Sequence, residues 1–175
     1  MRTRALAAAV AIAAAAALSA GAAGVSAASV DAKATKAPVC AGKTKKTAIK
    51  DIKKAYKTLF DGSSPLPLDE RFKNVENADD PEFLAVLNGV AATQAAMLKV
   101  VDSDVKTVTC AGKKAANVTW DLILSGQPAT GLAPPGHAVL DGKKWLVAQS
   151  TVCDLFALAD PTLVQSGPCL KAAGG

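Results

Sequence analysis

The sequence has few of the side chains that enzymes and metal sites commonly use. Histidine occurs once, at His137, and aromatic residues make up only 4% of the 175 residues. The four cysteines lack C-x-x-C spacing, which disfavours a zinc or redox site. Motifs of the G-x-S-x-G, H-E-x-x-H and phosphate-loop types are also missing. These absences favour a protein that is not an enzyme and that carries no metal or other cofactor.

Other proportions are ordinary for a folded protein. Half of the residues are hydrophobic and 20% are charged, which excludes disorder of the whole chain, because disorder requires low hydrophobicity and high net charge. The length suits one domain. We expect a folded domain over residues 47–160, preceded by a flexible polar tether over 28–46 and followed by a tail over 161–175.

The first 27 residues have the order of a secretory signal peptide. Arg2 and Arg4 precede an uncharged run of 14 residues, and small residues then lead to Ala27. The run is shorter than the roughly 20 residues that cross a bilayer, so we expect cleavage and no stable membrane insertion. Cleavage after Ala27 is the first choice and after Ala22 the second. The expected product is secreted and extracellular, either free or associated with the cell wall.

Cleavage leaves 18 basic and 15 acidic side chains, a formal net charge of +3. A cluster of lysines follows the tether: Lys43, Lys45, Lys46, Lys50, Lys53, Lys54 and Lys57. One interpretation is a cationic binder of anionic envelope polymers. We favour a solvated helix face, because charge runs usually face water. Nucleic acid is not expected, because aromatic residues that would stack on bases are not interleaved with these lysines.

Helical spacing dominates the first half of the domain. A stripe of apolar residues predicts a helix that ends at the turn-forming residues 61–65: Ile49, Ile52, Tyr56, Leu59 and Phe60. A shorter helix is expected around residues 66–75. A third has a clear start, with Asp80 as N-cap and Pro81 in the first turn. This helix is expected to continue through Ala95 to Met97, although Gly89 weakens the pattern.

The apolar spacing becomes alternating after Leu98. Residues 100–109 and 116–124 predict strands, and the second places its apolar residues, among them Trp120, on one face. Asp141-Gly142 indicates a hairpin between strands at 137–140 and 143–152. Consecutive strands with short links predict an antiparallel four-stranded meander whose apolar face receives the N-terminal helices. The expected fold class is therefore α+β.

This strand order also restricts which cysteines can form disulfides with one another. Cys110 would end the first strand and Cys153 the fourth, and these ends lie on opposite edges of a meander. Their separation would exceed the ~7 Å between Cα atoms that a disulfide tolerates. We therefore predict a Cys153–Cys169 disulfide and, by exclusion, a Cys40–Cys110 disulfide.

Three runs of sequence carry a family resemblance: AYKTLFDGSSPL (55–66), ILSGQPA (123–129) and AVLDGKKWLVAQSTVCDLFAL (138–158). They resemble the secreted low-molecular-weight antigen family of mycobacteria and related actinobacteria, over roughly residues 46–160. The resemblance implies the nuclear-transport-factor-2-like (NTF2-like) or cystatin-like superfamily, in which a curved antiparallel sheet wraps around helices to form a cone. The tether with Cys40, and also Cys110 and Cys169, have no clear place in the family pattern.

The resemblance implies a non-enzymatic protein that binds a small apolar ligand or a protein partner at the cell envelope. Large side chains are the candidates for lining such a ligand cavity: Tyr56, Phe60, Phe72, Phe83 and Trp120. Some cone-shaped relatives are isomerases or dehydratases. That alternative requires Asp121, His137 or Tyr56 to converge within one enclosed pocket. We expect Asp121 and His137 at the surface and Tyr56 in the core instead.

Residues Trp145 and Val147 raise a separate alternative. If they are exposed on the outer sheet face, they suit a homodimer interface through the sheet. Otherwise the C-terminal tail, held by a disulfide at Cys153, covers them. The sequence favours neither arrangement.

Overall fold

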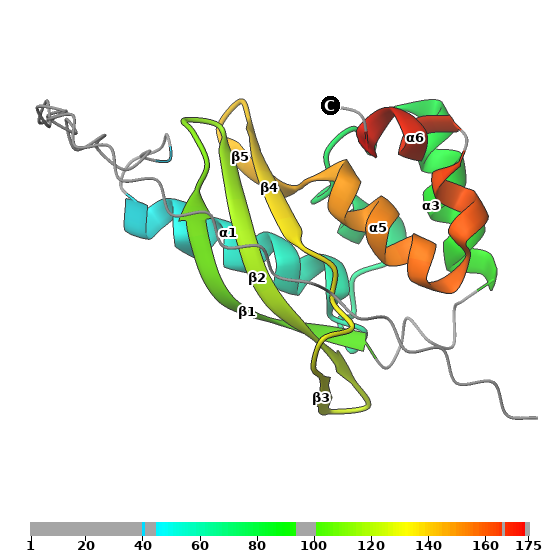
Figure 1. Cartoon of the computed structure of the whole chain (residues 1–175), viewed down its shortest axis with the longest axis horizontal. Coiled ribbons are helices and arrows are strands. Elements are labelled where there is room, and N and C mark those ends of the chain that lie inside the picture. Colours follow the sequence, from blue (N-terminus) through cyan, green and yellow to red (C-terminus); the bar gives the residue numbers. More distant parts are fainter. Residues whose placement is uncertain (1–39, 41–44, 94–100, 166, 174–175) are drawn as a thin grey trace, which may run out of the picture. The chain divides into compact units, whose positions relative to one another are not determined.

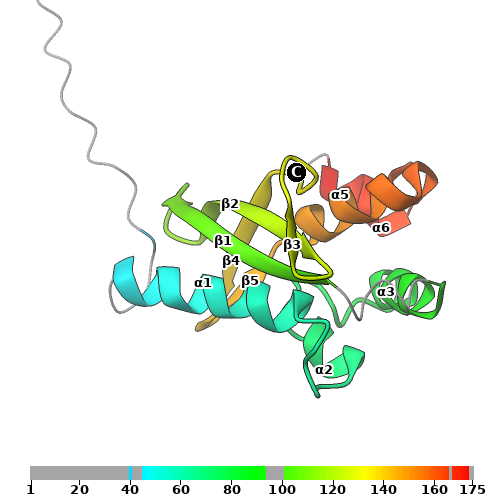
Figure 2. The same cartoon turned by 90° about the horizontal axis from the view of Figure 1, so that it is seen from below.

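The long helix α1 (Lys45–Phe60) lies across the concave face of a curled antiparallel sheet (Figures 1 and 2). The computed structural model describes Cys40 and residues 45–93, 101–165 and 167–173. The predictions of a signal peptide, of most of the tether and of a helix continuing through Ala95 to Met97 lie outside these residues. Within the described part of the chain, no helix is long and apolar enough to span a bilayer.

The sheet confirms the predicted antiparallel order. Its strands follow one another as β1-β2-β4-β5, and β3 pairs with β2 away from this path. The strands are β1 (Val101–Cys110), β2 (Ala115–Leu124), β3 (Gln127–Ala129), β4 (Gly136–Asp141) and β5 (Lys144–Val147). The short β3 was not predicted. The turn at Ser125 and Gly126, both with positive φ, lets the chain fold back onto β2.

Alternation along β2 directs its apolar side chains toward α1. Val118, Trp120 and Leu122 are buried, whereas Asn117 and Thr119 on the opposite face are exposed. The predicted hairpin at Asp141-Gly142 is also present, since Asp141 pairs with Lys144. The fold is therefore α+β, with helices against a curled antiparallel sheet, as the sequence predicted.

The remaining helices gather beside the sheet rather than on its concave face (Figures 1 and 2). They are α2 (Leu68–Phe72), α3 (Pro81–Thr93), α5 (Gln149–Ala159), the short 3₁₀ helix η1 (Pro161–Val164) and α6 (Gly167–Ala173). Helix α3 begins where predicted, because the Asp80 carboxylate accepts hydrogen bonds from the backbone N–H groups of Glu82 and Phe83. Helix α6 contacts both α3 and α5.

The strand predicted over residues 143–152 is correct only for its first part. Strand β5 ends at Val147 and helix α5 begins at Gln149. The backbone of Val147 bonds to Asn74 and Glu76, and the Glu76 carboxylate accepts the N–H of Gln149 at 3.1 Å. A distant segment thus ends the strand and satisfies an N–H of the first helical turn. The segment predicted as a tail likewise contains α6.

Two disulfides join Cys40 to Cys110 and Cys153 to Cys169, with Cα separations of 5.1 and 5.4 Å. This is the predicted pairing. The argument for it was partly wrong, because Cys153 lies in α5 and not at the end of a strand. The second bridge joins α5 to α6, and the first ties Cys40 to the end of β1.

The proposed dimer surface at Trp145 and Val147 is not available. Their exposed fractions are 3% and 0%. Strand β5 contacts α1, and Val147 forms a bridge with Val75 at the edge of the sheet. These residues therefore belong to the core, and helix α1 and the segment around Val75 cover them rather than the tail.

Candidate functional site

Three aromatic side chains fill the space between α1 and the sheet. The Tyr56 ring meets Trp120 edge to face, with 5.4 Å between the ring centroids, and Phe60 stacks on Trp120 at 4.8 Å. The Tyr56 hydroxyl donates a hydrogen bond to the backbone oxygen of His137 at 3.0 Å. Burial raises the pKa of Tyr56 well above its usual value, although hydrogen bonds with Thr151 and the His137 backbone oppose that shift. Tyr56 is therefore a neutral core residue.

A glycine makes this close packing possible. A Cβ atom at Gly136 would lie 2.6 Å from the Tyr56 hydroxyl and 2.8 Å from the Val118 carbonyl oxygen. The Trp120 indole lies nearby and donates a hydrogen bond to the Pro134 carbonyl at 3.0 Å. The side chains around Gly136 are thus closely packed.

The C-terminal end of α1 also borders a hollow, and Phe60 contributes to both regions. A pocket of about 280 Å³ lies among α1, α2, α3 and α5, next to the ends of β1 and β2. Its wall is almost entirely aliphatic and aromatic and includes Leu59, Phe72, Leu87, Val152 and Phe156. Most of these side chains are buried, so the pocket extends from the surface into the core.

The rim of the pocket reaches the surface at two leucines. Leu132 and Leu158 also line it, and their exposed fractions are 53% and 60%. Single exposed leucines are common on protein surfaces, but these two lie together at the mouth of an apolar pocket. A ligand would reach the interior between the loop of Leu132 and the end of α5.

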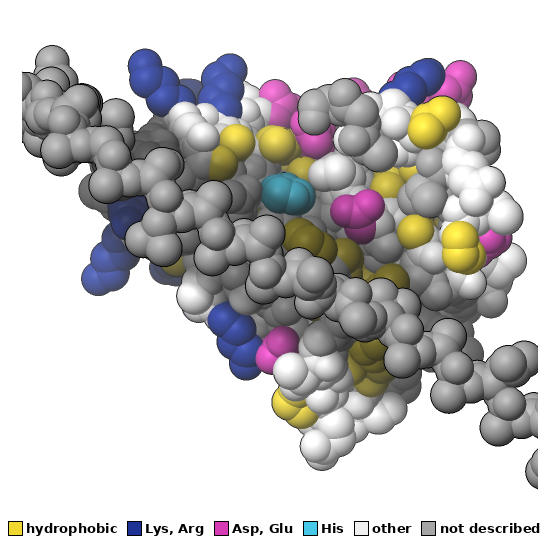
Figure 3. Space-filling view, viewed as in Figure 1, with side chains coloured by type: hydrophobic (Ala, Val, Ile, Leu, Met, Phe, Trp, Pro, Cys, Tyr) yellow, Lys and Arg dark blue, Asp and Glu magenta, His cyan; other side chains and the backbone are white. Residues whose placement is uncertain are grey.

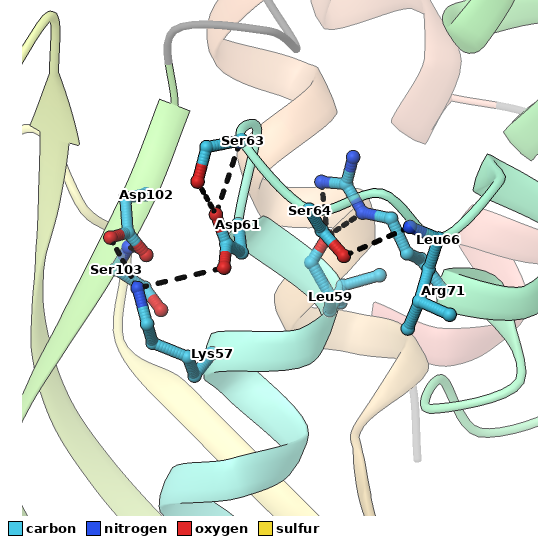
Figure 4. Close-up of polar contacts among 9 residues, drawn as sticks. All are labelled: Lys57, Leu59, Asp61, Ser63, Ser64, Leu66, Arg71, Asp102 and Ser103. Carbon is cyan, nitrogen blue, oxygen red and sulfur yellow. Dashed lines mark hydrogen bonds and ion pairs between the residues drawn. The ribbon is translucent and has the colours of Figure 1, made fainter.

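One charged side chain, Arg71 of α2, belongs to the pocket wall. It is only 5% exposed. Its Nε and Nη2 atoms both donate to the Leu59 carbonyl oxygen, at 3.0 and 2.6 Å. That oxygen belongs to the last turn of α1, where carbonyl groups lack helical partners. Figure 4 shows the third guanidinium nitrogen directed away from Leu59 with no contact drawn to it.

An acidic residue lies near Arg71 without pairing with it. The Asp61 carboxylate accepts hydrogen bonds from the Ser63 hydroxyl at 2.6 Å and its N–H at 3.1 Å (Figure 4). The Ser63 hydroxyl bond is the main reason why the pKa of Asp61 is lowered, with Lys57 and Arg71 adding to the effect. Burial lowers the pKa of Arg71, and the charge of Asp61 opposes this shift. Arginine nevertheless stays charged at any physiological pH.

The ionisable groups of the three catalytic candidates, Asp121, His137 and Tyr56, do not lie together in one pocket. Asp121 forms an ion pair with Lys106 at 3.3 Å on the outer face of the sheet. His137 is exposed (Figure 3), and its Nδ1 lies 3.2 Å from the Asn117 side-chain oxygen. Tyr56 reaches only the backbone of His137, from the opposite face.

His137 instead borders a polar hollow of about 500 Å³ together with Glu76, Asp80 and Lys171. The carboxylates here already bond to the backbone: Glu76 to Gln149, and Asp80 to the start of α3. Lys171 pairs with Glu82 at 3.2 Å. His137 and Asp80 are both exposed at this hollow.

The lysine cluster lies along α1, as the solvated-face interpretation predicts. Its members from Lys45 to Lys57 are all exposed, and Lys43 lies outside the described residues. Lys57 also forms an ion pair with Asp102 of β1 at 2.6 Å. This contact raises the pKa of Lys57. It ties the end of α1 to the edge of the sheet.

Two of the five residues predicted to line a cavity, Phe60 and Phe72, do line the apolar pocket. Tyr56, Phe83 and Trp120 are buried in packed parts of the core. Sequence reasoning missed Arg71 and the contribution of α5. The α5 signal was available, since Val152, Leu155 and Phe156 have the three- and four-residue spacing of a helix face.

Comparison with known proteins gives one match. The family model described as low molecular weight antigen MTB12, C-terminal domain, matches residues 44–162. No curated protein and no solved structure was found to match the chain.

Proposed function

Because the chain belongs to the low molecular weight antigen MTB12 family, we propose that it is an exported, non-catalytic protein that holds a small apolar ligand in the pocket among α1, α2, α3 and α5. The observation that carries this proposal is a hollow of about 280 Å³ with an almost wholly apolar wall. Protein interiors are normally close-packed, with few voids larger than a water molecule. A hollow of this size thus has a cost in stability that ligand binding would offset.

The volume suits a small ligand. It lies at the lower end of the roughly 300–1,000 Å³ typical of ligand pockets. An apolar cavity of ~150 Å³ is enough for benzene, so by the same ratio the pocket would hold an aliphatic chain of about ten carbons. The exposed Leu132 and Leu158 give such a chain a path to the interior.

Two disulfides support export. All four cysteines are paired within the described residues. Disulfides form and persist in oxidising compartments and are rare in the cytosol. Membership of an antigen family agrees with a location outside the cell, at the envelope or in the medium.

The lack of a catalytic role is supported by the arrangement of the ionisable groups. In the described residues, the apolar pocket contains one of them, Arg71, and an arginine does not exchange protons at neutral pH. Asp121 and His137 face outward, away from this pocket. An acid–base reaction needs at least one group that can give or take a proton at the ligand.

Binding of decanol tests the proposal, with two adjacent alanines of α3 as a matched pair. Ala91 lines the pocket and Ala92 is exposed outside it. Ala91→Phe would occupy the hollow with a ring, whereas Ala92→Phe adds the same ring at the surface. Isothermal titration calorimetry should show decanol binding to the wild type and to Ala92→Phe. Ala91→Phe should weaken binding by at least about tenfold.

Thermal denaturation provides a second readout. A ligand at 100 times its Kd stabilises the folded state by about 2.7 kcal/mol, so decanol should raise the Tm of the wild type and of Ala92→Phe. Circular dichroism of each variant verifies that it is folded. If decanol neither bound nor stabilised the folded wild type, the proposed function would be wrong.

A further inference from the structure

We propose that the ligand is an amphipathic monocarboxylate, such as a medium-chain fatty acid, whose carboxylate binds Arg71 while its chain fills the apolar pocket. The inference rests on the proposed function, because it assigns a head group to the ligand of the same pocket. The inference concerns the charge of the ligand's head group, whereas the proposed function concerns the apolar volume that the ligand fills.

The first argument is the incomplete hydrogen bonding of Arg71. A guanidinium carries five N–H donors, and two of its nitrogens share one acceptor, the Leu59 carbonyl. The third, Nη1, makes neither of these bonds, and its direction in Figure 4 is away from Leu59. The Nη1 donors, which make neither of these bonds, thus belong to a side chain that is 95% buried and that lines the pocket.

The second argument is the lack of an ion pair at contact distance, since the charge of Asp61 acts on Arg71 without a salt bridge between them. A buried charge is costly unless it is paired. Among the described residues Arg71 has no ion pair, and its acidic neighbour Asp61 is held by Ser63 and lies 3.8 Å from the Lys57 ammonium. An anion in the pocket would supply a direct ion-pair partner, and a carboxylate matches the planar fork of a guanidinium.

The third argument is the contrast within the pocket wall. Apart from Arg71, the side chains that line it are aliphatic or aromatic. A polar or multiply charged ligand would leave its remaining groups without partners. A single carboxylate on an apolar chain satisfies both parts of the wall.

A purely structural role for Arg71 is the competing explanation. Its bonds to Leu59 cap the last turn of α1, which a cation also favours through the helix dipole. A cap of this kind uses the donors directed at Leu59 and predicts no preference among ligand head groups. The head-group preference of the folded wild type therefore separates the two roles without any substitution.

Calorimetric titration with three ligands of equal chain length makes this comparison: decanoate, decanol and decyltrimethylammonium, each below its micelle concentration. The wild type should bind decanoate at least about tenfold more tightly than decanol, as expected for a charge-assisted hydrogen bond. Decyltrimethylammonium should bind most weakly. Arg71→Met should bring decanoate and decanol to within about twofold of each other.

A matched control removes a positive charge that is not in the pocket. Lys73 is exposed two residues away and pairs with Glu70. Lys73→Met should keep the preference for decanoate, which excludes a general effect of net charge. If Arg71→Met fails to fold, the affinities of the wild type for the three ligands still test the carboxylate assignment.

The outcomes are distinct. Binding of decanol as tight as that of decanoate would overturn the carboxylate assignment and leave the apolar pocket intact. Binding of none of the three ligands would overturn the proposed function itself. A preference for decanoate that Arg71→Met abolishes and Lys73→Met retains supports the assignment.

Discussion

Helix α1 borders two regions that differ in how they are filled. Toward the sheet, Tyr56, Phe60 and Trp120 interlock and Gly136 allows their closest approach. Toward α2, α3 and α5, the same helix faces a hollow of about 280 Å³ with one buried cation in its wall. The comparison teaches that a closely packed region positions a second, open region, to which the proposed binding belongs.

Removal of the two disulfides should produce the largest changes in the free energy of unfolding. In the chain-entropy model, the Cys40–Cys110 bridge, with 70 residues of separation, contributes about 4 kcal/mol, and the Cys153–Cys169 bridge, with 16, about 3 kcal/mol. Replacing Cys40 and Cys110 by alanine should therefore lower the free energy of unfolding more than replacing Cys153 and Cys169. Urea denaturation of the two double variants measures both values. Equal losses, or a larger loss from the second pair, would contradict this order.

Gly136→Ala should disrupt the filled region. The added Cβ would lie 2.6 Å from the Tyr56 hydroxyl and 2.9 Å from the Trp120 ring, and overpacking at a rigid site costs about 3 kcal/mol. Gly89→Ala in α3 is the control, because nothing lies within 4 Å of its added Cβ. It should stabilise the protein by about 1 kcal/mol through helix propensity. Thermal denaturation should show shifts of opposite sign.

Alkaline titration examines the filled region through Tyr56, which is the only tyrosine in the chain. Its pKa is raised in the folded state, so it contributes stability below pH 10.0, its unperturbed value, and that stability is lost as the pH rises further. The ultraviolet absorbance of tyrosinate should therefore appear only when the protein unfolds. Ionisation near the unperturbed pKa in a protein that remains folded would show that Tyr56 is accessible to water.

The smallest expected changes in stability concern two buried hydroxyl groups. The Ser103 hydroxyl is buried with no hydrogen-bond partner among the described residues, so Ser103→Ala should stabilise the protein by about 1 kcal/mol. Thr151 is also buried, but its hydroxyl accepts the N–H of His137 at 2.7 Å. Thr151→Ala should destabilise by a similar amount. Guanidinium denaturation of both variants would reveal whether the two effects have opposite signs.

The filled region could be predicted from the sequence because its signals are local. Three signals are each contained in one short segment of sequence: the apolar stripe of α1, the alternation around Trp120 and the Asp141-Gly142 turn. They were sufficient for the α+β class. The disulfide pairing was also predicted correctly, although the argument for it placed Cys153 at the end of a strand and not in α5. The superfamily assignment stays a prediction.

The open region could not be predicted in the same way, because long-range contacts form it. Glu76 and Asn74 determine where β5 ends and α5 begins, more than 70 residues along the chain. Arg71 resembles any exposed charge on a short helix, and its burial depends on the Leu59 carbonyl. The pocket exists only once these separate segments have come together.

Chemical-shift mapping by proton–nitrogen correlation NMR tests the central claim most directly. On titration with decanoate, the account predicts that the largest shifts cluster at pocket residues such as Arg71, Leu87, Val90 and Phe156. The amides of Asn117 and Thr119, on the exposed face of β2, should move little. Shifts concentrated on that face, or around His137 and Gln149 in the polar hollow, would contradict the assignment of the ligand to the apolar pocket.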